Sequence, residues 1–416
     1  MQFGDEWLAT DKASFQQDAN DTATTDFSDP RDFVPPEKCK WVTPVIAGVV
    51  TLLSLIVIVA QAGGTVSQSS PRVVLFVIEG FKATVFEETI THGIRGPNMQ
   101  ALCQQGSYAA CLGTSDTRCC RAQTGPKNGP QFSWSAAPGI ASILTGVDSP
   151  KHQVTNTSFA AMSNFADSSQ RYPSIASIAT KAGIKVAAFG GSSLLTSIDD
   201  TGKCGGYGVL DFECGVLSAQ RCTAQQTCNL NRRFSYPTTN GAINQEDMVD
   251  DIARVVDDDV GLLIVHLNRL NFAATQKPGG RFESASMPYS AQIYLTDSIV
   301  GRVVSMISRT ISRRRENWLI MGVSDHGGLV SSYGTNPDDD EVVAFFLSTL
   351  TMQGTTLLDF PSQPTTQMDV APTLLHWLGV FDATATVPTI QFDGRRQAIC
   401  TDGKSVRNCT RTSVLI

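Results

Sequence analysis

The sequence predicts an α/β fold in which helices sandwich a mostly parallel β-sheet, with one transmembrane helix before it. Short apolar runs of strand length alternate with segments of helix length, which is typical of a parallel sheet covered on both faces. Several of these runs stop at glycine or at polar residues, as strands do at the edge of such a sheet. A separate stretch near the N-terminus is apolar and uncharged over the length of a membrane span.

The N-terminal part of the chain differs in composition from the rest. Residues 1–40 are rich in Asp, Thr, Ser and Gln, which predicts a disordered cytoplasmic tail. Residues 43–62 predict a transmembrane anchor, because the uncharged stretch Val45–Ala62 is long enough to cross a bilayer at roughly 1.5 Å per residue. A cleaved signal peptide is the alternative, but so long a leader before the apolar core is unusual for one.

Basic residues set the expected orientation of this anchor. Lys38 and Lys40 precede it and the next basic residue, Arg72, lies well after it, so the positive-inside rule places the tail in the cytoplasm. We therefore expect a type II single-pass protein of the plasma membrane or secretory pathway. A linker over residues 63–71 would lead to a luminal or extracellular domain over residues 72–416.

The composition of this domain fits an oxidising compartment. Ten of the eleven cysteines follow the anchor, which predicts up to five disulfides. Asn156 and Asn408 begin N-glycosylation sequons, so we expect a glycoprotein. The net charge of −7 argues against binding to nucleic-acid polymers.

The elements of the domain follow in order along the chain. Apolar runs predict strands at Arg72–Ile78, Tyr108–Leu112, Ile184–Phe189, Gly261–Leu267, Trp318–Ser324 and Val342–Leu347. We expect helices at Pro97–Gln105, Gly139–Leu144, Ser174–Ala182, Gln245–Asp258, Tyr289–Ser312 and Asp369–Leu378. Three arginines after Ser312 suit the negative end of a helix dipole, and Asp369 is well placed as an N-cap.

The most informative segment is Trp318–Gly328, WLIMGVSDHGG, in which an apolar run ends in Asp325 and His326 before two glycines. In parallel α/β sheets, sites form at the carboxyl ends of strands, and carboxylate and imidazole groups are common metal ligands. Glu79 and the segment Asn268–Thr275 follow other predicted strands. We therefore expect these residues at the same edge of the sheet.

A set of motifs in fixed order resembles the alkaline phosphatase superfamily, in particular its type I phosphodiesterase/nucleotide pyrophosphatase-like branch. The resemblance covers most of Arg72–Arg395 and rests on VVLFVIEGF, PNMQALCQQG, SAAPGIASILTGVDSPKH, ENWLIMGVSDHGG, DVAPTLLHWLGV and DGR. It implies an alkaline-phosphatase-like fold and the hydrolysis of phosphate esters with two metal ions. Two such cations stabilise the phosphoryl oxygens and activate the nucleophile.

The resemblance also assigns the ligands of the first metal. Glu79 stands where an aspartate is expected, and Asp325 and His326 match the family pattern. The nucleophile position falls on Ala136, which has no nucleophilic atom, and its neighbour Ser135 is the candidate replacement.

The ligands implied for the second metal are all replaced. Their positions fall on Asn271, Thr275 and Tyr333, none of which is a strong ligand for a divalent metal. Other histidines offer no obvious substitute, since His266 lies in an apolar run and reads as a core residue, and His152 reads as solvent-facing. We expect one divalent metal such as zinc, and no two-metal site.

Three functions are compatible with this pattern. The first is a membrane-anchored phosphodiesterase/nucleotide pyrophosphatase-like pseudoenzyme that binds a phosphorylated or glycan ligand through Glu79, Asp325, His326 and one metal. The second is an active metal-dependent phosphodiesterase or phosphatase that uses Ser135. The third is a structural surface glycoprotein. Hydrolysis, metal content and ligand binding separate them.

Overall fold

A computed structural model describes residues 70–92, 95–105, 120–125, 136–154, 172–190, 232–235, 238–239, 242–243, 245–333, 342–351, 358–359, 365–380, 392–395 and 398–399. All of them belong to the second of two compact units, Ser69–Ile416. Within these residues, no helix has the length and apolar character needed to cross a membrane. Several predictions concern residues outside the described ranges and therefore stay predictions. They are the tail and anchor, the sequons, most of the cysteines, Ser135 and the expected strand at Tyr108–Leu112.

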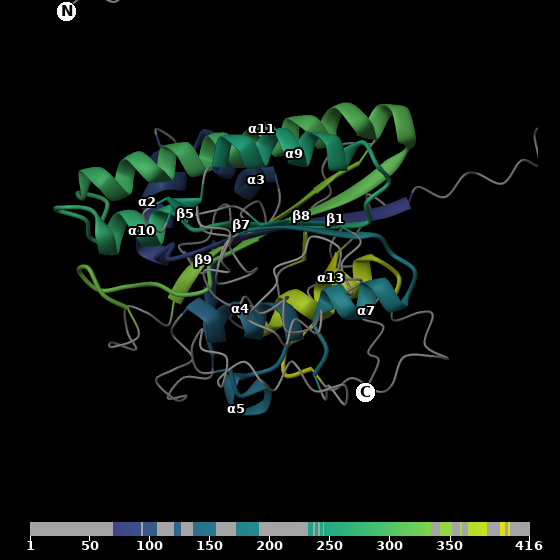
Figure 1. Ribbon diagram of the computed structural model, residues 1–416, viewed down its shortest axis with the longest axis horizontal. Helices are drawn as coiled ribbons and strands as arrows, with labels where there is room; N and C mark the ends of the chain where they lie inside the picture. Colours follow the sequence, from purple (N-terminus) through teal and green to yellow (C-terminus); the bar gives the residue numbers. More distant parts are fainter. Residues whose placement is uncertain are drawn as a thin grey trace, which may run out of the picture. The chain divides into compact units, whose positions relative to one another are not determined.

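The centre of the unit is an eight-stranded sheet (Figure 1). In spatial order its strands are β11 (Thr365–Thr366), β2 (Arg121–Gln123), β9 (Val342–Leu350), β8 (Glu316–Val323), β1 (Ser70–Ile78), β7 (Leu262–Leu267), β3 (Val186–Gly190) and β4 (Arg232–Ser235). All neighbours in this sheet are parallel except β9, which runs antiparallel to both β8 and β2. The sheet is therefore mixed, with a parallel centre as predicted and one reversed strand.

Helices cover both faces of this sheet (Figure 1). One face carries α2 (Ala83–His92), α3 (Pro97–Gln105), α9 (Gln245–Val256), α10 (Arg269–Gln276) and α11 (Met287–Arg314). The other carries α4 (Ala136–Thr145), α7 (Ile175–Lys181) and α13 (Val370–Trp377), with the short α5 (Ser149–His152) and the 3-10 helix η6 (Gln367–Asp369) nearby. Two small antiparallel pairs complete the described structure, β5 (Thr238–Thr239) with β6 (Ala242–Ile243) and β10 (Leu358–Asp359) with β12 (Ala398–Ile399).

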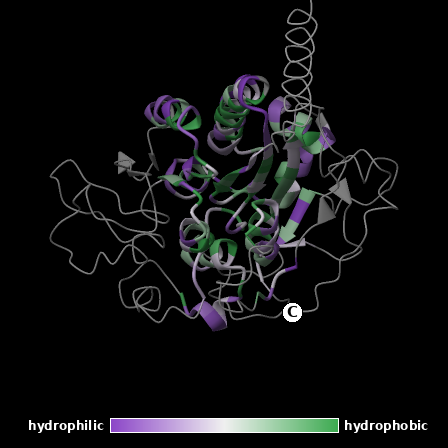
Figure 2. Ribbon diagram, turned by 90° about the vertical axis from the view of Figure 1, so that its right-hand side faces the viewer, coloured by the Kyte–Doolittle hydropathy of each residue, from purple (hydrophilic) through white to green (hydrophobic). Residues whose placement is uncertain are grey.

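The apolar runs are continuous because both faces of the central strands are buried. Along β1, Val73, Leu75 and Val77 face the core beneath α4, α7 and α13. The alternate residues, Val74, Phe76 and Ile78, face the core beneath α2, α3, α9 and α11. Figure 2 shows the hydrophobic strands between these two helix layers. Alternation of side chains along a strand thus supplies two separate cores from one strand.

The sheet register places the carboxyl ends of β1, β7 and β8 next to one another. Val77 of β1 pairs with His266 of β7 on one side and with Val323 of β8 on the other. Two residues further along the strands come Glu79 and Asp325, on the same face as Val77 because side chains alternate. This face is covered by α4, α7 and α13. The register therefore builds the edge at which the sequence predicted a site.

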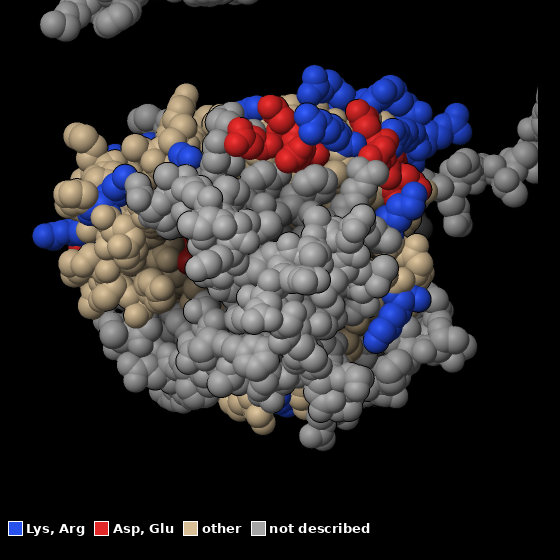
Figure 3. Space-filling model, viewed as in Figure 1, with Lys and Arg blue, Asp and Glu red and all other residues tan. Residues whose placement is uncertain are grey.

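The opposite end of the central strands is held by ion pairs. Arg72, buried at the start of β1, lies 3.0 Å from Glu316 of β8 and 2.5 Å from Asp259. Trp318 donates its indole N–H to the same Glu316 carboxylate over 2.8 Å. Nearby, charges of both signs alternate over α9 and α11, as Figure 3 shows along the upper edge of the molecule. These paired charges form a structural cluster at the amino end of the sheet.

The structure contains two helices that were not predicted. The segment Arg269–Gln276, for which no element was predicted, forms helix α10, and its position is fixed by a bond from the Asn271 N–H to the Glu79 carbonyl. Helix α2 was not predicted. Asp369 is the N-cap residue of α13 as predicted, but its side chain makes no capping bond there, because its carboxylate accepts from the backbone N–H groups of Thr366 and Arg395.

Candidate metal site

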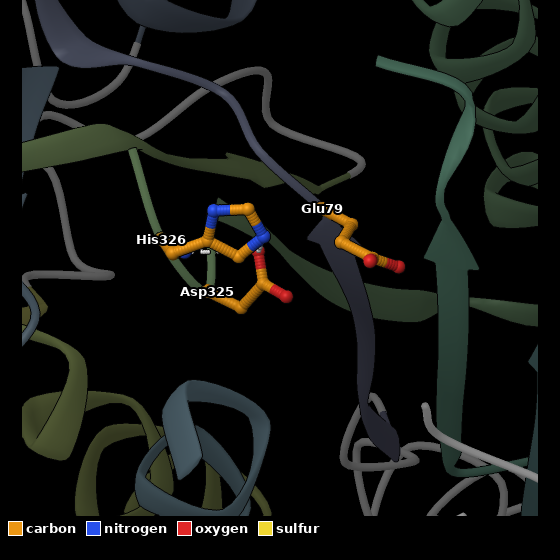
Figure 4. Close-up of side chains that lie close together, drawn as sticks. All are labelled: Glu79, Asp325 and His326. Carbon is orange, nitrogen blue, oxygen red and sulfur yellow. Dashed lines mark hydrogen bonds and ion pairs between the residues drawn. The ribbon is translucent and has the colours of Figure 1, made fainter. Parts of the chain in front are cut away.

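Three predicted ligands converge at the carboxyl ends of β1 and β8. Glu79 follows β1, and Asp325 and His326 follow β8. One ligand atom from each lies within 4.8 Å of the others. Figure 4 shows Asp325 and His326 side by side, facing the end of the neighbouring strand that carries Glu79. All three side chains are buried, with Asp325 and His326 fully inaccessible to solvent.

The Asp325 carboxylate is oriented by the backbone on both strands. Its Oδ1 atom accepts from the Gly80 N–H over 3.0 Å and from the His326 N–H over 2.9 Å. Gly80 adopts φ +76°, a conformation that favours glycine, and its Cα lies against Asn271. The second oxygen, Oδ2, is buried without a hydrogen-bond partner among the residues described. A buried carboxylate with one unsatisfied oxygen is suited to a cation.

The turn that carries Asp325 is held from behind by η6 and α4. The Gln367 amide nitrogen donates to the carbonyls of Ser324 (2.6 Å) and Asp325 (2.8 Å). Gly139 of α4 packs so closely that an added Cβ would lie 2.1 Å from the Asp325 carbonyl oxygen. The start of α4 and the ligand turn are therefore fixed against each other. No local sequence pattern pointed to Gln367.

His326 is held in a tautomer that suits metal binding. Its Nδ1 lies 2.6 Å from the Gly327 carbonyl, and because a carbonyl can only accept, Nδ1 carries the hydrogen. The lone pair then lies on Nε2, which is 3.8 Å from Oδ1 of Asp325. Metal-binding histidines are usually oriented in this way, by a hydrogen bond from the ring nitrogen that does not bind the metal.

Each oxygen of Glu79 lies close to a polar side chain. The Asn271 amide donates to Oε1 over 2.7 Å, and Nε2 of His266 lies 3.1 Å from Oε2. His266 is fully buried in β7. The sequence correctly placed His266 in the core, but missed its contact with Glu79, which only the strand register reveals.

The surroundings shift the pKa values of Glu79 and Asp325 in opposite directions. Burial raises the pKa of Glu79, but the hydrogen bond and charge of His266, together with His326 and Asn271, outweigh it and lower the pKa overall. Burial raises the pKa of Asp325 well above its usual value, and the charge of Glu79 raises it further. Relative to the free side chains, the surroundings therefore favour the ionised form of Glu79 and the neutral form of Asp325.

The positions implied for the second metal make interior contacts instead. Asn271 is engaged with Glu79, and the Thr275 hydroxyl donates to the Asn271 carbonyl within α10 over 2.8 Å. The Tyr333 ring stacks on the His326 imidazole, with centroids 4.0 Å apart and an interplanar angle of 26°. Burial and the charge of Glu79 raise the pKa of Tyr333 to about 12, so its hydroxyl stays neutral.

The implied nucleophile position lies at the start of α4. Ala136 is the first residue of this helix and is buried. Its methyl group cannot attack an ester. The alternative, Ser135, lies outside the described residues, so its role as a nucleophile stays a prediction.

A buried serine–histidine pair near this helix is not a catalytic dyad. His152 was expected to face solvent, but it is buried, and its Nε2 lies 3.0 Å from the Ser142 hydroxyl. The Val154 N–H donates to Nδ1 over 3.0 Å, so the imidazole hydrogen is on Nε2 and points at Ser142. A histidine in this tautomer cannot take the hydroxyl proton, and the pair is structural.

The donor set fits one divalent metal. Two carboxylates and one imidazole nitrogen are common zinc ligands, and Asp325 presents an unsatisfied oxygen to the site. At the positions implied for a second metal, the Asn271 amide contacts Glu79 and the Tyr333 ring stacks on His326, so the expectation of a single metal stays a prediction.

A protein-family model matches the larger part of the chain. The sulfatase family model matches residues 130–380, more than half of the chain. This span contains Asp325 and His326, whereas Glu79 precedes it. No curated protein matches the chain significantly.

Several solved structures are similar to this chain at low identity. A protein of the alkaline phosphatase superfamily from Vibrio parahaemolyticus has 14% identity and a TM-score of 0.46, over 75% of this chain and 67% of its own. The C-terminal periplasmic domain of EcEptC from Escherichia coli, in complex with Zn, has 13% identity and a TM-score of 0.44, over 76% and 84%. The lipoteichoic acid synthase LtaP from Listeria monocytogenes has 12% identity and a TM-score of 0.44, over 75% and 73%.

The predicted phosphodiesterase/nucleotide pyrophosphatase branch is finer than these matches and stays a prediction. The match over most of the α/β unit, together with the mixed sheet sandwiched by helices, supports the alkaline-phosphatase-like fold. On this basis the chain belongs to the sulfatase family.

Proposed function

We propose that this chain is a pseudoenzyme of its family, which binds one divalent cation and a phosphorylated ligand without hydrolysing it. The main observation in its support is that residues at the positions implied for the second metal contact other side chains of the site. Asn271 is bonded to Glu79, and Tyr333 is stacked on His326, so neither is available to a second cation. The ligands of the first metal are retained and converge.

The chemistry of ester hydrolysis explains why these changes matter. Two cations would stabilise both the attacking and the leaving oxygen of a phosphoryl or sulfuryl group, and a hydroxyl would form the covalent intermediate. Here Ala136 supplies no hydroxyl and the second cation has no ligands among the described residues. Loss of both features predicts binding without turnover.

The site keeps a place for an anionic group. The first turn of α4 lies against the Asp325 turn, because Gly139 allows close contact with the Asp325 carbonyl. Backbone N–H groups at the start of a helix attract anions. A cation held by Glu79, Asp325 and His326 would add a positive charge beside that turn. We infer a phosphorylated ligand, in keeping with the phosphodiesterase-like motifs, and include sulfate esters in the test because of the family.

We further propose that the unit is displayed on the luminal or extracellular side of a membrane. This rests on the uncharged segment at residues 43–62 and on the basic residues before it. The same placement accounts for the cysteine content and for the sequons.

Hydrolysis and metal content together test the proposal. We would measure zinc content of the full chain, purified in detergent, and its activity on p-nitrophenyl phosphate, the nitrophenyl ester of thymidine monophosphate and p-nitrophenyl sulfate. We expect about one equivalent of metal and no hydrolysis of any substrate. Activity that disappears in Ser135→Ala and in EDTA would instead establish an active enzyme, and absence of both metal and hydrolysis would leave a structural glycoprotein.

A further inference from the structure

We propose that His266 is a positioning residue for metal binding, which fixes the longer side chain of Glu79 at a position where an aspartate is expected. The inference rests on the proposed metal site and adds a residue outside its ligand set. It starts from a departure in sequence: Glu79 has one more methylene than aspartate, which moves its oxygens by roughly one C–C bond, about 1.5 Å. It also adds one rotatable bond that must be held.

The sheet register places His266 where it can hold this side chain. Val77 and His266 are paired neighbours on β1 and β7, and Glu79 lies two residues beyond Val77. The Glu79 and His266 side chains therefore emerge on the same face of the sheet. The Glu79 N–H also donates to the Leu267 carbonyl over 2.9 Å, which ties the two strand ends together.

The contacts of His266 point to Glu79 alone. Its Nε2 is 3.1 Å from Oε2 of Glu79. Both ring nitrogens are buried and neither has a partner of hydrogen-bond geometry among the described residues, so the approach of Nε2 to Oε2 is an ion-pair contact rather than an aligned hydrogen bond. The rest of β7 is apolar, so a leucine or valine would be the ordinary residue at this place. A buried imidazole that lies against a buried carboxylate is best explained by that carboxylate.

Asn271 completes the arrangement from the other side. It donates to Oε1 of Glu79 over 2.7 Å, so the carboxylate is held between a strand residue and a helix residue. Each carboxylate oxygen keeps a further lone pair for a cation. Hydrogen bonds of this kind orient a metal-binding carboxylate, and their loss commonly lowers metal affinity about 10–100-fold.

The test compares His266→Leu, His266→Gln and the wild-type full chain by zinc calorimetry and by thermal unfolding in EDTA. We expect His266→Leu to weaken zinc binding about tenfold or more. His266→Gln, whose amide can still donate to Glu79, should recover most of that loss. His152→Leu is the matched control, since it removes a buried histidine away from the site and should lower stability without changing zinc affinity.

A second measurement tests the contact without any metal. In EDTA, His266→Leu and Glu79→Gln should be strongly non-additive, because both remove one interaction. Unchanged zinc affinity in His266→Leu, or an additive cycle, would overturn the inference. A wild-type chain that binds no zinc would instead refute the proposed function and the role of His266 in metal binding, and the cycle would then decide only whether His266 fixes Glu79.

Discussion

Asn271 shows how one residue changes the electrostatics of this site. Its amide faces the Glu79 carboxylate at 2.7 Å, where the family resemblance implies a metal-binding aspartate. An aspartate here would remove a donor and set two acceptors against each other in a buried region. We expect Asn271→Asp to lower the free energy of unfolding of the metal-free chain by about 1–3 kcal/mol, measured by urea denaturation in EDTA.

Asn271→Ala provides the comparison for this change. It removes the same donor without adding a charge, so it should cost less than Asn271→Asp. Equal losses would show that repulsion between the two carboxylates contributes nothing. Zinc should reduce the difference in stability between Asn271→Asp and Asn271→Ala. A cation beside Glu79 would attract both Glu79 and the aspartate introduced at position 271, and so offset their repulsion.

His152 gives the molecule a predictable sensitivity to acid. Burial lowers its pKa from 6.5 to about 3, so the unfolded chain binds more protons between these values. Its contribution to stability is fully present above the unfolded pKa and is lost as pH falls toward the folded one, at most about 1.4 kcal/mol per pH unit. We expect His152→Gln, which can keep both hydrogen bonds, to lose less stability than wild type between about pH 7 and 4.5. Urea midpoints that fall by the same amount for wild type and His152→Gln across this pH range would contradict the expectation.

Single residues also mark the limit of what the sequence could predict. Asp325 and His326 were identifiable because a strand, two ligands and two glycines are contiguous in the chain. The partners of Glu79 were not, since His266 and Asn271 are distant in sequence and reach it only through strand pairing and helix packing. Tyr333 was recognised as a lost ligand, but its stacking on His326 required the folded loop.

Among the elements, η6 has the clearest influence on the site. Gln367 at its start donates to two consecutive carbonyls of the Asp325 turn, and the Asp369 carboxylate fixes η6 to neighbouring backbone N–H groups. We expect Gln367→Met, which keeps the volume and removes the donors, to destabilise the chain by about 1–3 kcal/mol and to weaken zinc binding. Calorimetry and urea denaturation measure the two effects.

Thr373→Val is a useful control on the neighbouring helix. It removes a buried hydrogen bond from Thr373 to the Asp369 carbonyl, 2.6 Å long, but touches none of the metal ligands. It should reduce stability while leaving zinc affinity unchanged. If Gln367→Met also reduces stability without changing zinc affinity, then η6 stabilises the fold but does not position the turn that carries Asp325.

Elements with strong local signals were predicted well. The helix at Pro97–Gln105 has the predicted bounds, and the predicted helix from Ser174 begins with that residue as its N-cap, whose side chain accepts from the Ser177 N–H. The central strands are near-continuous apolar runs, so their existence was plain, whereas the antiparallel direction of β9 depends on chain connections that no local pattern encodes. Helix α10 was missed because its polar residues mask an apolar side, Leu270 and Ala274, that packs on the core.

At the scale of the whole molecule, the site is built from the sheet and from both helix layers that pack on it. The sheet supplies Glu79, Asp325 and His266 from three adjacent strands, each buried in two cores. One helix layer contributes Asn271 from α10, and the other places Ala136 and Gly139 of α4 against the same edge. Neither core includes Glu79, Asp325 or His326, so the fold does not depend on the changes that the proposed function invokes.

The second metal site should return only when its positions change together. Asn271 and Thr275 are four residues apart on α10, so an acid and a histidine there would share one helix face, and Tyr333 lies across the loop beside His326. We expect the triple variant Asn271→Asp, Thr275→His, Tyr333→His to bind about two equivalents of zinc, against one for wild type and for each single change. Elemental analysis after dialysis measures this directly. A triple variant that still holds one equivalent would show that these three positions do not form a second site, and a wild-type chain with two equivalents would remove the basis for calling it a pseudoenzyme.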